Sequence, residues 1–249
     1  MRVKKPNLLL NSIVSILKKS LVKFSNEIID ALSIDCVIFG FKNSALSVLL
    51  VKHGEGITKG HWALPGGWIQ YNESLDKAAY RILTAQTAVK NIYLEQFYVF
   101  GEVHRFLVKR VITVGYYALV NIENFELRAG PTVSDVVWFD IKNIPKMSFD
   151  HNKILKKCFT YLQHRVQHEP IGFNLLPKKF TLLQLQELYE AILEKKLDKP
   201  NFRRKLNKMN LLVPSSEKQK DVCHRAAQLY KFDKKVYDHL IENGFSFGI

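Results

Sequence analysis

The stretch WALPGGWIQYNESLDKAAYRILTAQTAV, residues 62–89, decides the fold of this chain. In LPGG, residues 64–67, the proline fixes one φ angle and the glycines permit positive ones, so a tight turn is predicted. From Leu75 onward, apolar residues recur at helical spacing, which predicts a helix of three to four turns with Asn72 as its N-cap. One face of this helix is expected to pack, and the other is free for a ligand.

Runs rich in valine, isoleucine and aromatic residues surround this helix and predict a mixed β-sheet. SIDCVIFGF and LSVLLVKH, within residues 31–53, are expected to form a hairpin around the polar turn KNSA at 42–45. Three further strands are expected in IYLEQFYVFGEV, RVITVGYYALV and VVWFDI. A helix from about residue 150 to 167 would close an α/β/α sandwich, so the first domain is predicted over residues 31–168.

Residues 1–30 have a basic start followed by apolar residues at helical spacing. This pattern predicts an amphipathic N-terminal extension. Packing on its own domain or on a second subunit is the favoured role, and binding to an anionic membrane surface is the alternative. The interrupted apolar run does not fit a signal peptide, and a transmembrane helix is not expected.

The charge of the chain points to a polyanionic partner. The formal net charge is +14, from 37 basic and 23 acidic residues, and the sequence pI is about 9.6. This exceeds what solubility requires and favours nucleic acid. The three cysteines, Cys36, Cys158 and Cys223, have no metal-site spacing. Neither a disulfide framework nor a zinc site is therefore expected, and a cytoplasmic location is predicted.

The C-terminal part, residues 169–249, is predicted to be a winged helix. The proline- and glycine-containing segment 168–180 is the expected linker. Thr181 is expected to cap the first helix, and Asp198 the second, in which Pro200 occupies the first turn. Residues 195–208 hold seven basic residues and one acidic residue, a local charge of +6 (7 − 1).

A helix, a turn, a basic helix and two short β runs indicate a helix-turn-helix with a wing, whose second helix enters the major groove of DNA. The alternative is that the basic run is only a solvated charged surface. The residues expected to contact DNA are Lys199, Asn201, Arg203, Arg204, Lys205 and Lys208 and, in the wing, Arg225.

The pattern around the first helix resembles the Nudix box, which is Gly, five residues, Glu, seven residues, Arg-Glu-aliphatic, one residue, Glu-Glu, one residue, Gly-aliphatic. The positions that fit are Gly67, Glu73, Arg81, Leu83 and Val89. The positions that depart are the glutamates, here Ile82, Ala85 and Gln86, and the late glycine, here Ala88.

The resemblance implies that the catalytic activity of the Nudix family has been lost. In the family the box glutamates hold Mg²⁺ or Mn²⁺, and hard divalent ions need several oxygen ligands, which these replacements do not supply. Hydrolysis is therefore expected to be absent, with no metal and no cofactor, and Mg²⁺ only if residual activity exists. Glu73 and Arg81 are expected to form an ion pair that ties the loop to the helix.

The rest of the chain narrows the resemblance. A degenerate Nudix domain followed by LLPKKFTLLQLQELYEAIL and LDKPNFRRK, with the pair Asp150-His151, is similar to the Nudix-related transcriptional regulators of the NrtR type. The resemblance implies a homodimer that binds a palindromic operator in double-stranded DNA. It also implies that the Nudix domain senses a small metabolite, either ADP-ribose or a pentose such as arabinose.

Two segments depart from that family pattern. HRFLVKR, residues 104–110, replaces a loop with an Arg-Asp-Pro-like sequence, and the wing lacks the usual Gly-Arg-Pro turn. The ligand therefore stays open. The residues expected to contact it are Trp62, Gln70, Glu73, Arg81, His104 and Arg105.

A second hypothesis is an active Nudix hydrolase of ADP-ribose-like nucleoside diphosphates. Such an enzyme would have to take its metal from other carboxylates, and Glu55, Glu73 and Glu102 are the candidates. Turnover with Mg²⁺ or Mn²⁺ separates this enzyme from the regulator.

Overall fold

The computed structural model describes residues 29–219, 226–243 and 247–248. The predicted N-terminal helix and the predicted wing contact Arg225 lie outside these described residues. Among the described residues, no helix is long and apolar enough to cross a membrane.

The first hairpin is present as predicted. β1 (Leu32–Lys42) and β2 (Ala45–His53) pair antiparallel. Asn43 and Ser44 between them both have positive φ, 49° and 59°. Two successive positive φ angles match the twist of the flanking strands, so this short turn fixes the register of the hairpin.

The remaining strands complete a mixed sheet. The three predicted strands are β5 (Glu95–Phe100), β6 (Ile112–Asn121) and β7 (Val133–Asp140). Two short strands that the sequence did not predict, β3 (Trp62–Ala63) and β4 (Gly66–Trp68), join them. The order is β3-β2-β1-β6-β5, with β7 beside β2 and β4 beside β1. β1 pairs with β6 in parallel and lies at the centre of the sheet.

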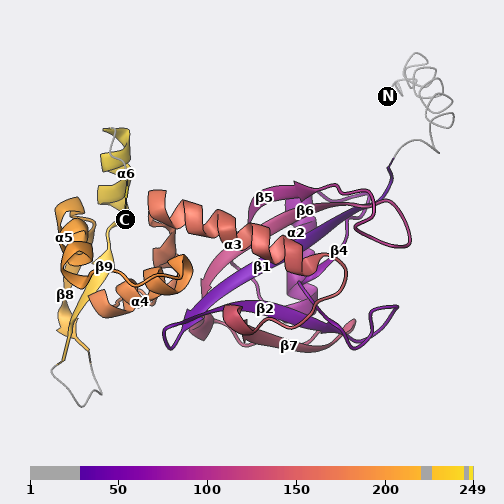
Figure 1. The fold of residues 1–249 in the computed structure, drawn as a ribbon, viewed down its shortest axis with the longest axis horizontal. Helices are drawn as coiled ribbons and strands as arrows, with labels where there is room; N and C mark the ends of the chain where they lie inside the picture. The colour runs from indigo at the N-terminus through magenta and orange to yellow at the C-terminus, as the bar shows by residue number, and fades with distance from the viewer. Residues whose placement is uncertain (1–28, 220–225, 244–246, 249) are drawn as a thin grey trace, which may run out of the picture.

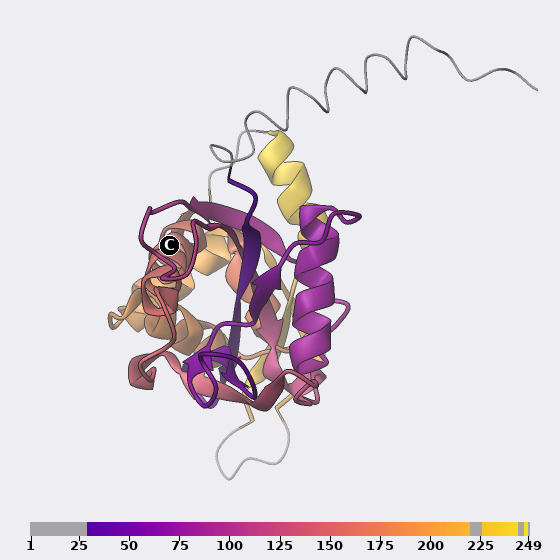
Figure 2. The ribbon, with the colours of Figure 1, turned by 90° about the vertical axis from the view of Figure 1, so that its right-hand side faces the viewer.

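Two helices cover opposite faces of this sheet, which confirms the α/β/α sandwich (Figures 1 and 2). Alternate residues of β1 face alternate helices, as strand geometry requires. Cys36 and Ile38 belong to the apolar cluster that includes α2 (Leu75–Thr87). Val37 and Phe39 belong to the cluster that includes α3 (His151–His168).

The N-cap of α2 corrects the sequence prediction. Ser74, not Asn72, caps the helix, and its hydroxyl accepts a hydrogen bond from the backbone N–H of Lys77 at 3.3 Å. Glu73 accepts from the backbone N–H of Gln70 at 2.8 Å. This bond closes a turn that contains Asn72, so the helix begins two residues later than predicted.

The two glycines of LPGG also differ from their prediction. Neither Gly66 nor Gly67 has a positive φ, because the segment continues as β4 beside β1. A Cβ atom at Gly66 would lie 2.2 Å from Oδ1 of Asp35. The close approach of the backbone to Asp35, rather than the φ angle, therefore requires glycine.

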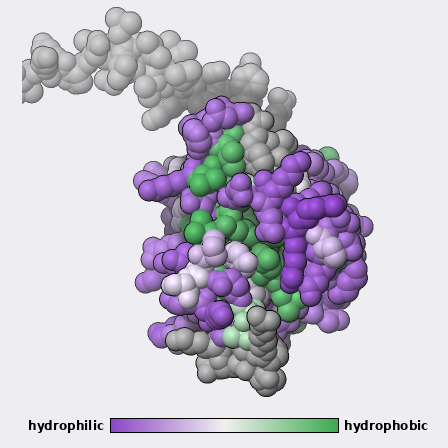
Figure 3. Space-filling view, turned by 90° about the vertical axis from the view of Figure 1, so that its left-hand side faces the viewer, coloured by the Kyte–Doolittle hydropathy of each residue, from purple (hydrophilic) through white to green (hydrophobic). Residues whose placement is uncertain are grey.

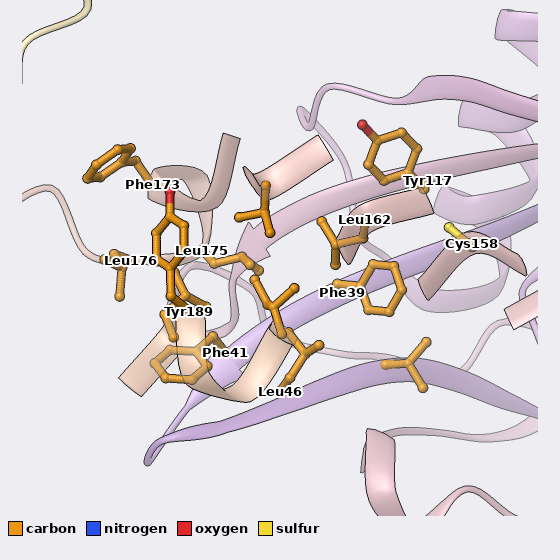
Figure 4. Packing of buried hydrophobic residues seen from close by; sticks show 14 of the residues in the cluster. Phe39, Phe41, Leu46, Tyr117, Cys158, Leu162, Phe173, Leu175, Leu176 and Tyr189 are labelled. Atoms are coloured by element: carbon orange, nitrogen blue, oxygen red, sulfur yellow. The ribbon is translucent and has the colours of Figure 1, made fainter. Parts of the chain in front are cut away.

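The segment predicted as a linker is buried. A 3₁₀ helix, η3 (Pro170–Leu175), follows α3, and the side chains of Phe173, Leu175 and Leu176 are buried. They join the cluster that contains Phe39 of the sheet and Tyr189 of the C-terminal part (Figure 4). One apolar core thus continues from the sheet into the C-terminal part of the chain.

The C-terminal part forms the predicted winged helix. It contains α4 (Leu182–Leu193), α5 (Lys199–Met209), the antiparallel pair β8 (Leu212–Lys218) and β9 (Gln228–Phe232), and α6 (Lys234–Glu242). Thr181 and Asp198 cap α4 and α5 as predicted. Phe180 and Tyr230 exchange backbone hydrogen bonds of 3.0 and 2.8 Å, which tie the wing to the start of α4.

Candidate functional site

A cavity of about 400 Å³ opens at the end of the sheet where β4 lies beside the start of β1. Asp35, Arg105 and His151 line it with polar groups, and Trp68, Phe106 and Phe149 with aromatic rings. Its volume lies within the range of small-ligand pockets, and a few convergent polar groups among apolar walls are typical of them.

Arg105 is the most firmly held polar residue of the cavity. Its Nε and Nη2 donate to the two carboxylate oxygens of Asp150 at 3.0 and 2.8 Å. Its Nη1 donates to the hydroxyl of Thr113. This two-pronged pair holds the loop between β5 and β6 against the start of α3.

Asp35 lies beside this pair and contacts its neighbours at longer distances. Its Oδ2 is 3.6 Å from Nη2 of Arg105, and its Oδ1 is 3.7 Å from Nε2 of His151. Nδ1 of His151 lies 3.0 Å from the backbone N–H of Leu64 and accepts its hydrogen bond, so a neutral ring carries its proton on Nε2, toward Asp35. Burial raises the pKa of the Asp35 carboxyl, opposed by the charges of His151 and Arg105.

Aromatic side chains form the mouth of the cavity. The ring of Phe106 lies edge-on to Trp68 at 5.9 Å and tilted against Phe149 at 4.7 Å between centroids. Trp68 is 49% exposed and Phe149 38% exposed. Exposed aromatic faces at a cavity mouth are suited to stacking on a planar ring of a ligand.

The Nudix box positions do not fit a metal. Ile82 is buried in the core. Gln86 accepts from the backbone N–H of Gly66 at 3.0 Å and donates to its C=O at 2.9 Å, so both its oxygen and its nitrogen are bonded to the backbone of Gly66. In the described part of the chain, no three His, Cys, Asp or Glu side chains are grouped to hold an ion. The set Glu55, Glu73 and Glu102 is therefore not assembled.

The ion pair predicted between Glu73 and Arg81 is present. Nε and Nη2 of Arg81 donate to the Glu73 carboxylate at 2.8 and 2.5 Å, and Nη2 also donates to the C=O of Trp68 at 2.9 Å. The hydrogen bonds from Arg81 lower the pKa of Glu73 to about 2. The pair ties the loop before α2 to the helix, as expected.

Among the six predicted ligand contacts, Arg105 lines the cavity. Trp62 packs edge-on against Phe139, with 4.7 Å between the ring centroids. Gln70 is exposed in the turn before α2. His104 lines a neighbouring pocket that includes Arg105 and Phe149. Glu73 and Arg81 lie outside the cavity lining, and the binding roles of all six stay predictions.

Sequence reasoning missed the other members of the site. Asp35, Trp68 and Phe106 come from three separate segments and Phe149 and His151 from a fourth, and only the fold brings the four segments together. One signal was available for Asp35, because it is a carboxylate inside the otherwise apolar run SIDCVIFGF. A charge at such a position is rarely buried without a partner or a ligand.

The predicted DNA-reading helix has the expected two faces. Phe202 and Leu206 of α5 are buried, which fixes the orientation of the opposite side. Figure 3 shows the face at this end of the molecule as mainly hydrophilic, with a narrow hydrophobic band across it. The side chains of five predicted contacts are exposed, namely Lys199, Asn201, Arg204, Lys205 and Lys208.

Two arginines of α5 differ in their surroundings. Nη2 of Arg204 donates to Oδ1 of Asn201 at 2.6 Å, so these two side chains form one exposed unit. Arg203 is half-buried, and its Nε is buried without a hydrogen-bond partner among the described residues. Arg204 is therefore the better placed of the two to reach DNA without rearrangement.

These features define a class: a Nudix sandwich with a degenerate box, joined to a winged helix with a basic second helix. Family models agree, since the NUDIX domain matches residues 30–158 and the NrtR DNA-binding winged helix domain matches residues 172–232. The chain belongs to the NrtR family of Nudix-related transcriptional regulators.

Individual relatives support this assignment. The ADPR-responsive transcriptional repressor of Acinetobacter baylyi is 30% identical over 211 residues, which cover 83% of this chain and 84% of that protein. The crystal structure of Shewanella oneidensis NrtR complexed with a 27mer DNA has a TM-score of 0.72 and 29% identity, covering 87% of this chain and 97% of that one.

A structure of the isolated sensor domain is also similar. The NUDIX domain of Shewanella oneidensis NrtR complexed with ADP ribose has a TM-score of 0.50 and 28% identity. It covers 57% of this chain and 97% of that one.

Proposed function

We propose that this protein is a homodimeric, cytoplasmic transcriptional repressor that binds palindromic operator DNA through α5 and the wing and responds to ADP-ribose in its Nudix cavity. The joining of two sites in one chain supports this most strongly. One is a basic, exposed helix presented by a winged helix, and the other is a ligand-sized cavity in a Nudix domain whose box has lost the glutamates after Arg81. The relatives that bind DNA and ADP-ribose supply the ligand class.

Loss of catalysis fits a sensor. Gln86 fastens its amide to the backbone of Gly66 instead of offering a carboxylate to a metal. A bound metabolite would then dissociate without being hydrolysed, and the occupied fraction of the cavity would report the concentration of the metabolite. A ligand alters DNA affinity only through its different affinities for two states of the protein.

DNA binding is tested by fluorescence anisotropy with the DNA upstream of the protein's own gene. We expect tight binding that resists random competitor DNA, and a changed affinity when ADP-ribose is added. Arg204→Ala should cost about 1–3 kcal/mol of specific binding. Arg128→Ala, which removes an exposed arginine of the Nudix domain that pairs with Glu126, is the matched control and should have no effect.

Other results have defined meanings. Binding no tighter than to random DNA would contradict the regulator and leave α5 as a charged surface. A response to arabinose with none to ADP-ribose would assign the sensor to a pentose. Binding to anionic vesicles but not to DNA would support the membrane-surface alternative.

The competing function, hydrolysis, is tested on the same preparation. We expect no turnover of ADP-ribose at high protein concentration with Mg²⁺ or Mn²⁺. Turnover that disappears in Glu73→Gln would favour the enzyme instead.

A further inference from the structure

Asp35 has an unusual environment for a buried carboxylate. The residue is 5% exposed, and its oxygens lie 3.6 Å from Nη2 of Arg105 and 3.7 Å from Nε2 of His151. Both separations exceed a hydrogen bond. In the described part of the chain these two long contacts are the polar side-chain contacts of the carboxylate, although buried carboxylates normally accept several short hydrogen bonds.

The carboxylate faces the cavity that we assign to the ligand. Asp35 belongs to its lining, and the backbone of Gly66 lies so close that a Cβ there would be 2.2 Å from Oδ1. A buried carboxylate with only long contacts retains unused acceptor capacity, so the position favours a ligand that brings hydrogen-bond donors.

The charges around Asp35 identify the donors. Asp35 and Asp150 place two carboxylates beside the single guanidinium of Arg105, and Asp150 already occupies its fork. A phosphate at this position would be repelled by the surplus of negative charge. The Nudix box has no metal-binding carboxylates, so no metal ion would be held there to offset the repulsion. Sugar hydroxyls suit the position, since neighbouring hydroxyls donate well to one carboxylate.

We infer that Asp35 accepts hydrogen bonds from the hydroxyls of the terminal ribose of ADP-ribose, and so selects a ligand that carries a sugar beyond its diphosphate. The inference rests on the proposed function. The aromatic mouth sets the direction of the ligand, because adenine stacks on rings such as Trp68 and Phe106. With adenine at the mouth, the terminal ribose lies at the polar part of the lining, beside Asp35, and the diphosphate lies between adenine and this ribose.

Calorimetric titration of the full-length protein with ADP-ribose and with ADP tests this orientation. ADP lacks the terminal ribose. We expect Asp35→Asn, which preserves shape but removes the charge, to weaken ADP-ribose binding by about 10-fold to 100-fold, the range for hydrogen bonds to a charged group. ADP binding should stay unchanged. Asp238→Asn, an exposed carboxylate on α6, is the matched control and should alter neither.

A ligand-side comparison needs no variant. Ribose 5-phosphate should displace ADP-ribose from the wild-type protein about 10-fold better than 2-deoxyribose 5-phosphate does. Equal displacement by the two sugars would overturn the inference.

The failures can be told apart. Equal ADP-ribose affinity of Asp35→Asn and the wild type, or equal loss for ADP-ribose and ADP, would overturn the role of Asp35 while ADP-ribose sensing stands. No binding of ADP-ribose to the wild type would overturn both the inference and the proposed ligand.

Discussion

Replacing Gln86 by glutamate restores one carboxylate of the Nudix box, and we expect this change to destabilise the protein. The C=O of Pro65 accepts from the backbone N–H of Cys36 on β1, so both backbone groups of the next residue, Gly66, point away from β1. Gln86 satisfies both of them. A carboxylate can only accept, so it keeps the bond from the N–H and loses the bond to the C=O.

The structure sets the size of the effect. Leaving the partly buried carbonyl of Gly66 without a donor costs about 1–3 kcal/mol. The new carboxylate oxygen would also face that carbonyl oxygen from the position of the amide nitrogen, 2.9 Å away, which adds repulsion. A stronger charge-assisted bond from the N–H offsets part of this. We expect a net loss of about 2 kcal/mol in free energy of unfolding, or roughly 4–8 °C in Tm.

Thermal and urea unfolding at pH 7 measure the loss, and Gln184→Glu provides the matched control. Gln184 completes the capping box of α4, and its side chain only accepts, from the backbone N–H of Thr181 at 2.8 Å. Glutamate serves equally in such a capping box, so this variant should match the wild type. If Gln86→Glu also matches the wild type, the clamp does not hold the loop. If that variant gains Mg²⁺-dependent hydrolysis of ADP-ribose, one carboxylate suffices and the fit argument is wrong.

Three further predictions concern the helices. Ala88 ends α2 with φ at 62°, so Ala88→Gly should raise the free energy of unfolding by about 1 kcal/mol, because glycine adopts this conformation without strain; an unchanged Tm would contradict this. The pKa of Glu73 is about 2, below its ordinary 4.5, so its pair with Arg81 stabilises the fold above pH 4.5 and stops doing so as the pH falls toward 2. Glu73→Gln should therefore lower Tm at pH 7 and come closer to the wild type near pH 2, and an equal deficit at both values would exclude the ion pair as its cause. Lys205→Ala should weaken DNA binding alike for all sequences and reduce the slope of log affinity against log salt by about 1, and an unchanged slope would remove it from the phosphate contacts.

Elements with a strong local pattern were predictable from the sequence. The hairpin, α2, the later strands and the two capped helices of the winged helix follow from periodicity, turn residues and caps. Helix starts are less certain where two capping residues stand close together. Asn72 and Ser74 are both good caps, and the choice depends on the hydrogen bond from Gln70 to Glu73, which the pattern of apolar residues does not reveal.

The site was less predictable because its residues are close in space and distant in sequence. Gly66 suggested a positive φ in the sequence, whereas glycine is required there because Asp35 approaches from another strand. Segment 168–180 suggested a linker through its prolines and glycine. Its apolar residues, such as Phe173, are buried because two parts of the chain share a core there.

That shared core limits how a ligand could act on DNA binding. β4, at the cavity, and α5 lie at opposite ends of the molecule (Figure 1), and one apolar cluster, from Phe39 through Phe173 to Phe202, joins the sheet to the winged helix. A ligand that prefers one state 100-fold supplies about 2.7 kcal/mol. Exposing even two buried side chains of this size costs about 3–6 kcal/mol. ADP-ribose with such a preference therefore cannot separate the winged helix from the sheet. In the dimer that we propose, it would instead change how two intact protomers are placed, and so the spacing of their α5 helices along the operator.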